Sequence, residues 1–205
     1  MSQNRIYLCL AHTSGNEQKF IQEAFDTNWV VPLGPNVDAF ETELENYVGE
    51  NKKVVALTSG TAAIHLALVA CGVRAGDEVI TQSFTFCASA NPITYLGATP
   101  IFIDSECDTW NMDPQLLEEA IKDRIEKTGK TPKAIITVSI YGMPYKIDEI
   151  AEIANRYDIP IIEDAADAFG SKYKGQVLGT FGKFGILSFN GNKMITTSGG
   201  GALIC

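Results

Sequence analysis

The chain has 205 residues, 45% of them hydrophobic and 20% charged, and its formal net charge is −9. This length and composition are ordinary for one globular domain, and a negative chain without a local cluster of Lys and Arg argues against a nucleic-acid-binding surface. No apolar run reaches the about 18 residues that a membrane-spanning helix needs, so no membrane partner is expected.

The N-terminus and the cysteines bear on the cellular compartment. The N-terminus shows no basic region followed by an apolar stretch and a small-residue cleavage site, as a secretory signal would. The cysteines are odd in number and have no C-x-x-C spacing, which is typical of reduced thiols in a cytosolic protein. We therefore expect a cytoplasmic protein. The cysteines are Cys9, Cys71, Cys87, Cys107 and Cys205.

Helix-like and strand-like segments alternate along the chain. The helical patterns occupy residues 16–26, 35–47, 61–71, 88–96, 114–126 and 147–157. Short, mostly β-branched runs, typical of buried strands, occupy residues 54–57, 78–81, 100–103, 134–138, 159–162, 186–189 and 202–204. This alternation predicts an α/β fold with three layers, αβα, around a mostly parallel sheet of about seven strands.

The first candidate site follows the strand-like run 54–57. Ser59-Gly60-Thr61 leads directly into a helical pattern, which places a helix N-terminus at the end of a strand. Such a terminus offers free backbone N–H groups and a partial positive charge to a phosphate. The alternative is a plain Ser/Thr helix cap. Neither G-x-x-x-x-G-K-[ST] nor G-x-G-x-x-G after the first strand is present, so neither nucleotide fingerprint explains such a phosphate.

The second candidate is Asp164, which lies where the strand-like run 159–162 ends, at the sheet edge where ligands collect in α/β folds. A carboxylate there could bind a metal, act as a base, or hold a heteroaromatic nitrogen in its protonated form. A metal is disfavoured, because no second Asp, His or Cys has ligand spacing with it and the two histidines, His12 and His65, lie in unrelated contexts.

The third candidate is Lys193, which stands between an apolar run ending at Phe189 and the turn Gly199-Gly200-Gly201. A partly desolvated lysine is more readily neutral, and a neutral amine can attack an aldehyde. Taken alone, the pattern is more often a surface lysine before an ordinary turn. Together, a lysine for an imine, a carboxylate for a pyridinium nitrogen and a helix N-terminus for a phosphate meet the requirements of pyridoxal 5′-phosphate (PLP), which we predict as the cofactor.

These motifs carry a resemblance along essentially the whole chain. The chain resembles the sugar aminotransferases of the DegT/DnrJ/EryC1/StrS family, which are PLP enzymes of fold type I. The resemblance implies that Lys193 forms the Schiff base, that Asp164 faces the pyridine nitrogen and that Phe86 stacks on the ring. It also implies that Gly60, Thr61 and Ser188 hold the phosphate. The landmarks, in order, are Pro32-Leu33-Gly34 with Phe40-Glu41, Ser59 to Ala63, Ser83 to Phe86, Tyr141-Gly142, Glu163 to Ala166, Lys172 to Gly175 and Ser188 to Gly201.

Asp167 is a departure from the family pattern. The resemblance places it near the phenolic oxygen of the cofactor, where many members carry Gln or His. A carboxylate there would repel a phenolate unless it is protonated or turned away. The alternative is an acid at a helix start that serves the backbone dipole. Related dehydratases replace the lysine with His, so Lys193 favours an aminotransferase.

The resemblance also implies the reaction and the partners. It implies transfer of an amino group, from L-glutamate as the expected donor, to a nucleotide-linked keto sugar, by a homodimer. Residues 190–201 and Pro32-Leu33-Gly34 are most similar to those of enzymes that aminate C4 of UDP-4-keto-6-deoxy-N-acetylhexosamines, as in bacillosamine-type synthesis.

Three alternatives remain open at the level of sequence. One is a different nucleotide sugar, either a 3-keto sugar or one linked to dTDP or GDP. Another is a cofactor-binding remnant without turnover, because family members carry a further, smaller C-terminal domain and this chain stops at Cys205. We therefore expect residues 1–205 to be the cofactor-binding large domain. The last is a nucleotide-binding α/β domain without PLP.

Overall fold

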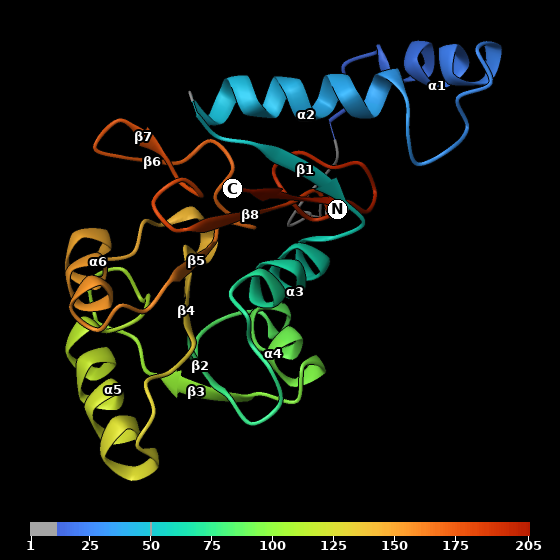
Figure 1. The fold of residues 1–205 in the computed structure, drawn as a ribbon. Helices are drawn as coiled ribbons and strands as arrows, with labels where there is room; N and C mark the ends of the chain where they lie inside the picture. The colour runs from blue at the N-terminus through green and yellow to red at the C-terminus, as the bar shows by residue number, and fades with distance from the viewer. Residues whose placement is uncertain (1–11, 50) are drawn as a thin grey trace, which may run out of the picture.

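A computed structural model describes residues 12–49 and 51–205 of the chain (Figure 1). Cys9 lies outside these residues, and the four cysteines inside them form no disulfide. In the described part of the chain, no helix combines the length and the apolar character that crossing a membrane requires.

One seven-stranded sheet forms the middle of the molecule. Its strand order is β1-β9-β8-β5-β4-β2-β3. The strands from β8 to β3 run parallel to one another, whereas β9 is antiparallel to both of its neighbours, β1 and β8. The prediction of a mostly parallel sheet of about seven strands is confirmed. The strands are β1 Val54–Leu57, β2 Glu78–Gln82, β3 Thr99–Ile103, β4 Ala134–Val138, β5 Ile161–Asp164, β8 Phe184–Ser188 and β9 Gly201–Ile204.

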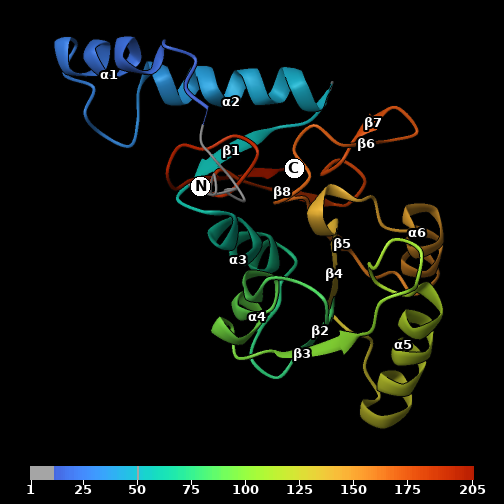
Figure 2. The ribbon, with the colours of Figure 1, turned by 180° about the vertical axis from the view of Figure 1, so that it is seen from behind.

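Helices cover both faces of the sheet, which confirms the three-layer prediction. Helices α3 and α4 lie on one face and α5 and α6 on the other, and the view from behind shows the same separation (Figures 1 and 2). The helix α2 packs along β1. Each face has its own apolar core, one containing residues of α3 and α4 and the other residues of α2, α5 and α6. The helices are α1 Glu17–Asp26, α2 Pro35–Val48, α3 Gly60–Ala70, α4 Asn91–Tyr95, α5 Pro114–Thr128 and α6 Ile147–Arg156.

Prolines explain two differences from the expected boundaries. The expected strand 159–162 is β5 at Ile161–Asp164, because Pro160 has no N–H for the ladder, and Asp164 is therefore the last residue of the strand. The expected helix 88–96 is instead a short 3₁₀ turn at Cys87–Ser89 followed by α4. A proline inside a helix removes a hydrogen bond and clashes with the preceding turn, so Pro92 stands in the first turn of a new helix.

A small hairpin, β6 Lys172–Tyr173 and β7 Gln176–Val177, was not expected from the sequence. Its turn residues Lys174 and Gly175 both have positive φ values, 49° and 85°. This is the combination that a two-residue type I′ turn requires. Strands of two residues are too short to show a period in the sequence.

The last strand brings two distant segments together at the edge of the sheet. β9 lies between β1 and β8, and Gly201 at its start lies against the backbone of Ser59 and Gly60, with no room for a Cβ atom. The start of α3 and the end of β8 are therefore held side by side.

Candidate functional site

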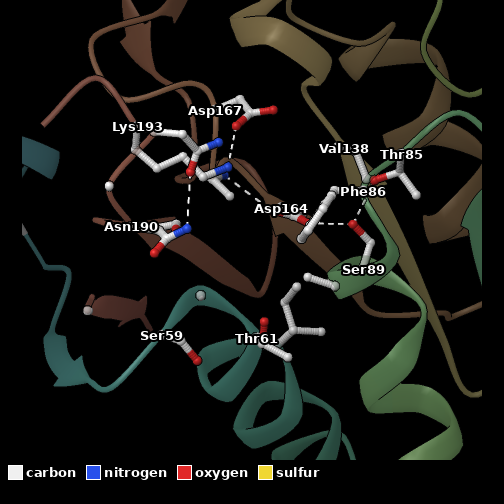
Figure 3. Close-up of a pocket in the computed structure, with 18 of the residues that line it drawn as sticks. Ser59, Thr61, Thr85, Phe86, Ser89, Val138, Asp164, Asp167, Asn190 and Lys193 are labelled. Carbon is white, nitrogen blue, oxygen red and sulfur yellow. Dashed lines mark hydrogen bonds and ion pairs between the residues drawn. The ribbon is translucent and has the colours of Figure 1, made fainter. Parts of the chain in front are cut away.

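A cavity of about 900 Å³ opens where β5, β8 and the start of α3 meet. All seven residues that the sequence singled out line it, so the fold brings them to one place. Figure 3 shows Lys193, Asp167 and Asp164 facing the same space, with Phe86 beside Asp164 and with Ser59 and Thr61 at the start of α3. The seven residues are Gly60, Thr61, Phe86, Asp164, Asp167, Ser188 and Lys193.

The N-terminus of α3 forms one wall of the cavity. Ser59 caps the helix, because its Oγ accepts a hydrogen bond of 3.1 Å from the N–H of Ala62. A Cβ atom on Gly60 would stand 3.0 Å from the Cβ of Ser188, so glycine allows β8 to pass close to the first turn. The Ser59 cap is present and the same helix terminus lines the cavity, so the two alternatives from the sequence do not exclude each other. A negatively charged group in the cavity would be stabilised by this terminus.

Asp164 forms the floor of the cavity and is only 4% exposed. Its Oδ2 accepts a hydrogen bond of 2.7 Å from Ser89 Oγ, and its Oδ1 accepts one of 3.1 Å from the N–H of Ala166. Burial raises the pKa of Asp164, the nearby Asp167 raises it further, and the hydrogen bonds and the charge of Lys193 oppose the rise. A cationic group placed against this carboxyl would favour its ionised form.

Two hydroxyl groups that the sequence does not predict lie next to Asp164. Thr85 Oγ1 and Ser89 Oγ are 2.7 Å apart, and Ser89, which is buried, donates onward to Asp164. The chain therefore supplies a polar relay that fixes the orientation of the carboxyl. Ser83-Phe84-Thr85-Phe86 is a landmark in the sequence, but nothing in the spacing indicates that Ser89 contacts a residue 75 positions later in the chain.

Lys193 and Asp167 form an ion pair across the cavity. The side chain of Lys193 is only 14% exposed, and the N–H of Lys193 donates a hydrogen bond of 2.9 Å to the carbonyl of Asn190. The loop from Asn190 to Gly200 joins β8 to β9, so both of its ends are fixed in the sheet. The lysine is thus partly desolvated, as expected, and its amine has a carboxylate beside it.

Phe86 supplies an apolar surface inside the cavity. It is 70% exposed although it lines the site, so one face of its ring is free to stack on a flat group. In the described residues, no cluster of three or more His, Cys, Asp or Glu side chains has the arrangement of a metal site.

Comparisons with known proteins agree with these features. A family model, described as the DegT/DnrJ/EryC1/StrS aminotransferase family, matches residues 12–205. The Bacillus subtilis protein named "Putative pyridoxal phosphate-dependent aminotransferase EpsN" is 56% identical over 200 residues, covering 98% of this chain and 51% of that protein. The GDP-perosamine synthase of Escherichia coli O157:H7 is 42% identical over 193 residues, covering 93% of this chain and 50% of that enzyme.

Solved structures show the same similarity. A DegT DnrJ EryC1 StrS aminotransferase from Brucella abortus superposes with a TM-score of 0.82 at 34% identity, over 93% of this chain and 52% of that one. The chain therefore spans about half the length of the relatives it matches.

Proposed function

The chain belongs to the DegT/DnrJ/EryC1/StrS aminotransferase family, and on this premise we propose that residues 1–205 are the cofactor-binding large domain of a PLP-dependent sugar aminotransferase. The proposed reaction moves an amino group from an amino acid, L-glutamate, to a nucleotide-linked keto sugar. The observation that carries the proposal is the meeting of Lys193, Asp164 and the N-terminus of α3 in one cavity.

The residues of the cavity fit PLP. The start of α3, with Gly60, Thr61 and the neighbouring Ser188, would hold the phosphate by backbone N–H groups and hydroxyls. Phe86 would lie against the ring, and Lys193 would supply the amine for covalent attachment. When bound, PLP supplies an aldehyde that captures amines and a protonated ring that withdraws electrons from the captured carbon.

Asp164 would keep the ring nitrogen protonated. Its carboxyl is buried and held by Ser89 and Ala166, so it is oriented before any ligand arrives. Burial disfavours its charge, and a cationic nitrogen opposite it would restore the ionised form. This carboxylate would be effective because its own side chain is buried, so water competes little for it.

Lys193 would act as the acid and base once its amine is released from the cofactor. Asp167, its ion-pair partner, would hold the ammonium group in the cavity and accept hydrogen bonds from Nζ. The same carboxylate would lie close to the cofactor, so we propose that Asp167 is a cofactor-binding residue that faces the lysine rather than a phenolate.

The proposed acceptor is C4 of a UDP-4-keto-6-deoxy-N-acetylhexosamine. The names of the relatives support a nucleotide-linked sugar, because one is a GDP-perosamine synthase and another, 42% identical over 172 residues, is a UDP-2-acetamido-2-deoxy-3-oxo-D-glucuronate aminotransferase. The same names leave a GDP-linked sugar and a 3-keto sugar as alternative acceptors, since one name specifies GDP and the other a 3-oxo sugar.

We propose a homodimer as the active form. Helix α1 has no buried residue, and it and the following segment expose large apolar side chains. Large apolar side chains exposed along one segment in this way support an interface. The exposed residues are Phe20, Ile21, Phe25, Trp29, Val30, Val31 and Leu33.

Trapping and turnover test the proposal separately. PLP is added to the chain, the mixture is reduced with borohydride, and the mass of the peptide that contains Lys193 is measured. Attachment at Lys193 is expected, and its absence would leave a nucleotide-binding α/β domain without PLP as the better reading. Amine transfer from L-glutamate to UDP-4-keto and GDP-4-keto sugars then distinguishes an active enzyme, and its acceptor, from a cofactor-binding form without turnover.

A further inference from the structure

Three exposed aromatic residues gather beside the cavity, and two of them, Phe84 and Tyr141, line it. The rings of Trp110 and Tyr141 lie 6.1 Å and 6.4 Å from the ring of Phe84. Trp110 is 63% exposed and Tyr141 83% exposed. We call Phe84, Trp110 and Tyr141 the aromatic cluster. Three separate segments of the chain contribute to it, so the fold, and not the local sequence, creates this surface.

Two of the three residues have an unusual backbone. Trp110 has a φ of 63° and Tyr141 a φ of 51°, in the left-handed region that bulky residues rarely adopt. Strained conformations persist where the surrounding structure enforces them, and they concentrate at binding and catalytic sites. Here the strain presents two large rings to solvent instead of burying them.

A buried pair of amides holds all three segments in place. Gln82 and Asn111 are fully buried, and their side chains are hydrogen-bonded to each other at 3.4 Å. Gln82 Nε2 donates to the carbonyl of Phe84 at 2.9 Å, and Asn111 Nδ2 donates to the carbonyl of Met143 at 3.0 Å. Asn111 Oδ1 accepts from the N–H of Ile140 at 2.9 Å, so the turn that carries Tyr141 is held at both ends. The cluster is therefore organised in advance of any ligand.

A second cavity, of about 380 Å³, adjoins the first at Phe84, which lines both. Its size is within the range of small-molecule sites. Trp110 forms one side of it, and carboxylates and hydroxyls form the rest. The other lining residues are Ser83, Asp104, Ser105, Glu106 and Cys107.

The two carboxylates of this cavity differ in their availability. Glu106 is hydrogen-bonded within its own loop. Burial raises its pKa, but the hydrogen bonds from Thr109 and Asp108 lower it by more, and the pKa is about 2. Asp104 is exposed; its Oδ1 accepts the N–H of Ser105 at 2.8 Å, and within the described residues it forms no ion pair. Asp104 thus has an oxygen free for a ligand.

The charge and the shape together select the ligand. No cationic side chain lines the second cavity, and Glu106 is paired with Lys146 at 3.5 Å, so Asp104, unpaired among the described residues, is the charge that would repel a phosphate there. A neutral group with a flat ring and vicinal hydroxyls is suited to it, because the ring stacks on an aromatic side chain and the hydroxyls donate to a carboxylate. The nucleoside part of a nucleotide-linked sugar has both features.

We propose that the second cavity and the aromatic cluster form the subsite for the nucleoside of the substrate, with the base against Trp110 and the ribose hydroxyls on Asp104. The inference rests on the proposed function, since it extends the substrate from the keto sugar beside Lys193 outward past Phe84. The diphosphate would then cross the mouth between the two cavities, away from the carboxylates.

Binding of UDP, GDP and inorganic pyrophosphate to the PLP-loaded chain tests the subsite. Titrations use a Trp29→Phe background, in which Trp110 is the only remaining tryptophan of the two, and follow its fluorescence and the heat of binding. At least one of the two nucleotides is expected to quench Trp110 and to bind more tightly than pyrophosphate. In the unmodified background, Trp110→Ala is expected to weaken that nucleotide about tenfold, the effect of losing one stacked base, and to leave pyrophosphate unchanged.

Asp104→Asn and a control variant complete the test. Asp104→Asn is expected to reduce the preference for the ribonucleotide over its 2′-deoxy form, which a merely structural role would not do. Tyr95→Ala removes a similarly exposed aromatic residue outside both cavities and is expected to change nothing.

The results that would contradict the nucleoside subsite can be told apart. The subsite is refuted if neither nucleotide binds more tightly than pyrophosphate or if Trp110→Ala leaves the affinity unchanged. A change in molecular mass of Trp110→Ala without a change in affinity would make the aromatic cluster an interface between two copies. Borohydride trapping at Lys193 on the same samples shows separately whether the proposed function has failed.

Discussion

The adjacent residues Glu163 and Asp164 of β5 place their carboxyl groups on opposite faces of the sheet. Glu163 is fully buried on the side of α5 and α6, where its Oε2 accepts the N–H of Phe181 at 2.9 Å and its charge lies near Tyr145. Asp164 faces the cavity on the side of α3 and α4. Burial is the largest cause that raises the pKa of each. Burial and a raised pKa therefore do not identify a functional carboxyl; an open cavity with a lysine in it does.

Lys193→Ala is expected to have the largest effect on the cavity that Asp164 faces. We expect complete loss of borohydride-trapped PLP, because no other lysine lines the cavity in the described chain. The unfolding temperature should change little, since the lysine packs in a loop and not in the core. Mass measurement and thermal unfolding check both parts. Lys183→Ala, a change at a lysine outside the cavity, should retain the attachment. A covalent adduct in the Lys193→Ala protein would contradict the assignment.

Asp164→Asn tests the proposed role of the carboxylate. PLP should still attach at Lys193, because the phosphate and the amine are recognised elsewhere in the cavity. Amine transfer from L-glutamate, measured in a form of the protein that turns over, should slow by about two orders of magnitude, as expected when a preorganised charge is removed. A rate near that of the unchanged protein would mean that Asp164, like Glu163, is only a structural carboxyl.

Glu163 should behave in the opposite way. Glu163→Ala leaves the N–H of Phe181 without its acceptor and should cost about 1–3 kcal/mol in the free energy of unfolding. PLP should still attach at Lys193. Urea denaturation and trapping on the same variant provide the two measurements. If PLP no longer attached while the free energy of unfolding was unchanged, Glu163 would belong to the site and would not differ from Asp164.

Glu163→Gln sharpens the contrast through pH. The folded pKa of Glu163 is raised, so the folded state binds its proton more tightly than the unfolded chain does. The unchanged protein should therefore lose stability as the pH rises above about 4.3, the ordinary pKa of glutamic acid, until the folded pKa is passed. Glu163→Gln cannot titrate there, so the difference in free energy of unfolding between the two proteins should vary across that window. A constant difference would show that the carboxyl is not desolvated in solution.

Ser89→Ala should have the smallest effect. Its hydroxyl stabilises the ionised form of Asp164, so its removal raises the pKa of Asp164 further. The acid limb of the pH–rate profile of amine transfer should move to higher pH, and the rate on that limb should fall about threefold, the effect of one hydrogen bond. Ser89→Thr, which keeps a hydroxyl, should restore the profile. An unshifted limb in Ser89→Ala would remove Ser89 from the support of Asp164.

The sequence predicted the parts of this molecule that depend on short segments. The α/β order and seven strands follow from apolar runs, and the landmarks around Gly60, Asp164 and Lys193 lie at the ends of such runs. Ser89, Asn111 and Trp110 could not be predicted in this way. Their roles arise from contacts between segments far apart in the chain, such as Ser89 with Asp164 and Asn111 with Met143. A pattern with a period of two or of 3.6 residues carries no information on such pairs.

The position of β9 has a consequence for the order in which the protein is made. β9 follows β8 in the sequence, more than 140 residues after β1, yet it lies between β1 and β8, with Val54 opposite Ile204. During synthesis, β1 cannot join the sheet until β9 has emerged from the ribosome, and contacts between such distant residues form slowly. The loop with Lys193 is closed by the same event. A nascent chain that lacks β9 should therefore neither protect β1 from hydrogen exchange nor retain PLP, and both properties should arise together once β9 has emerged.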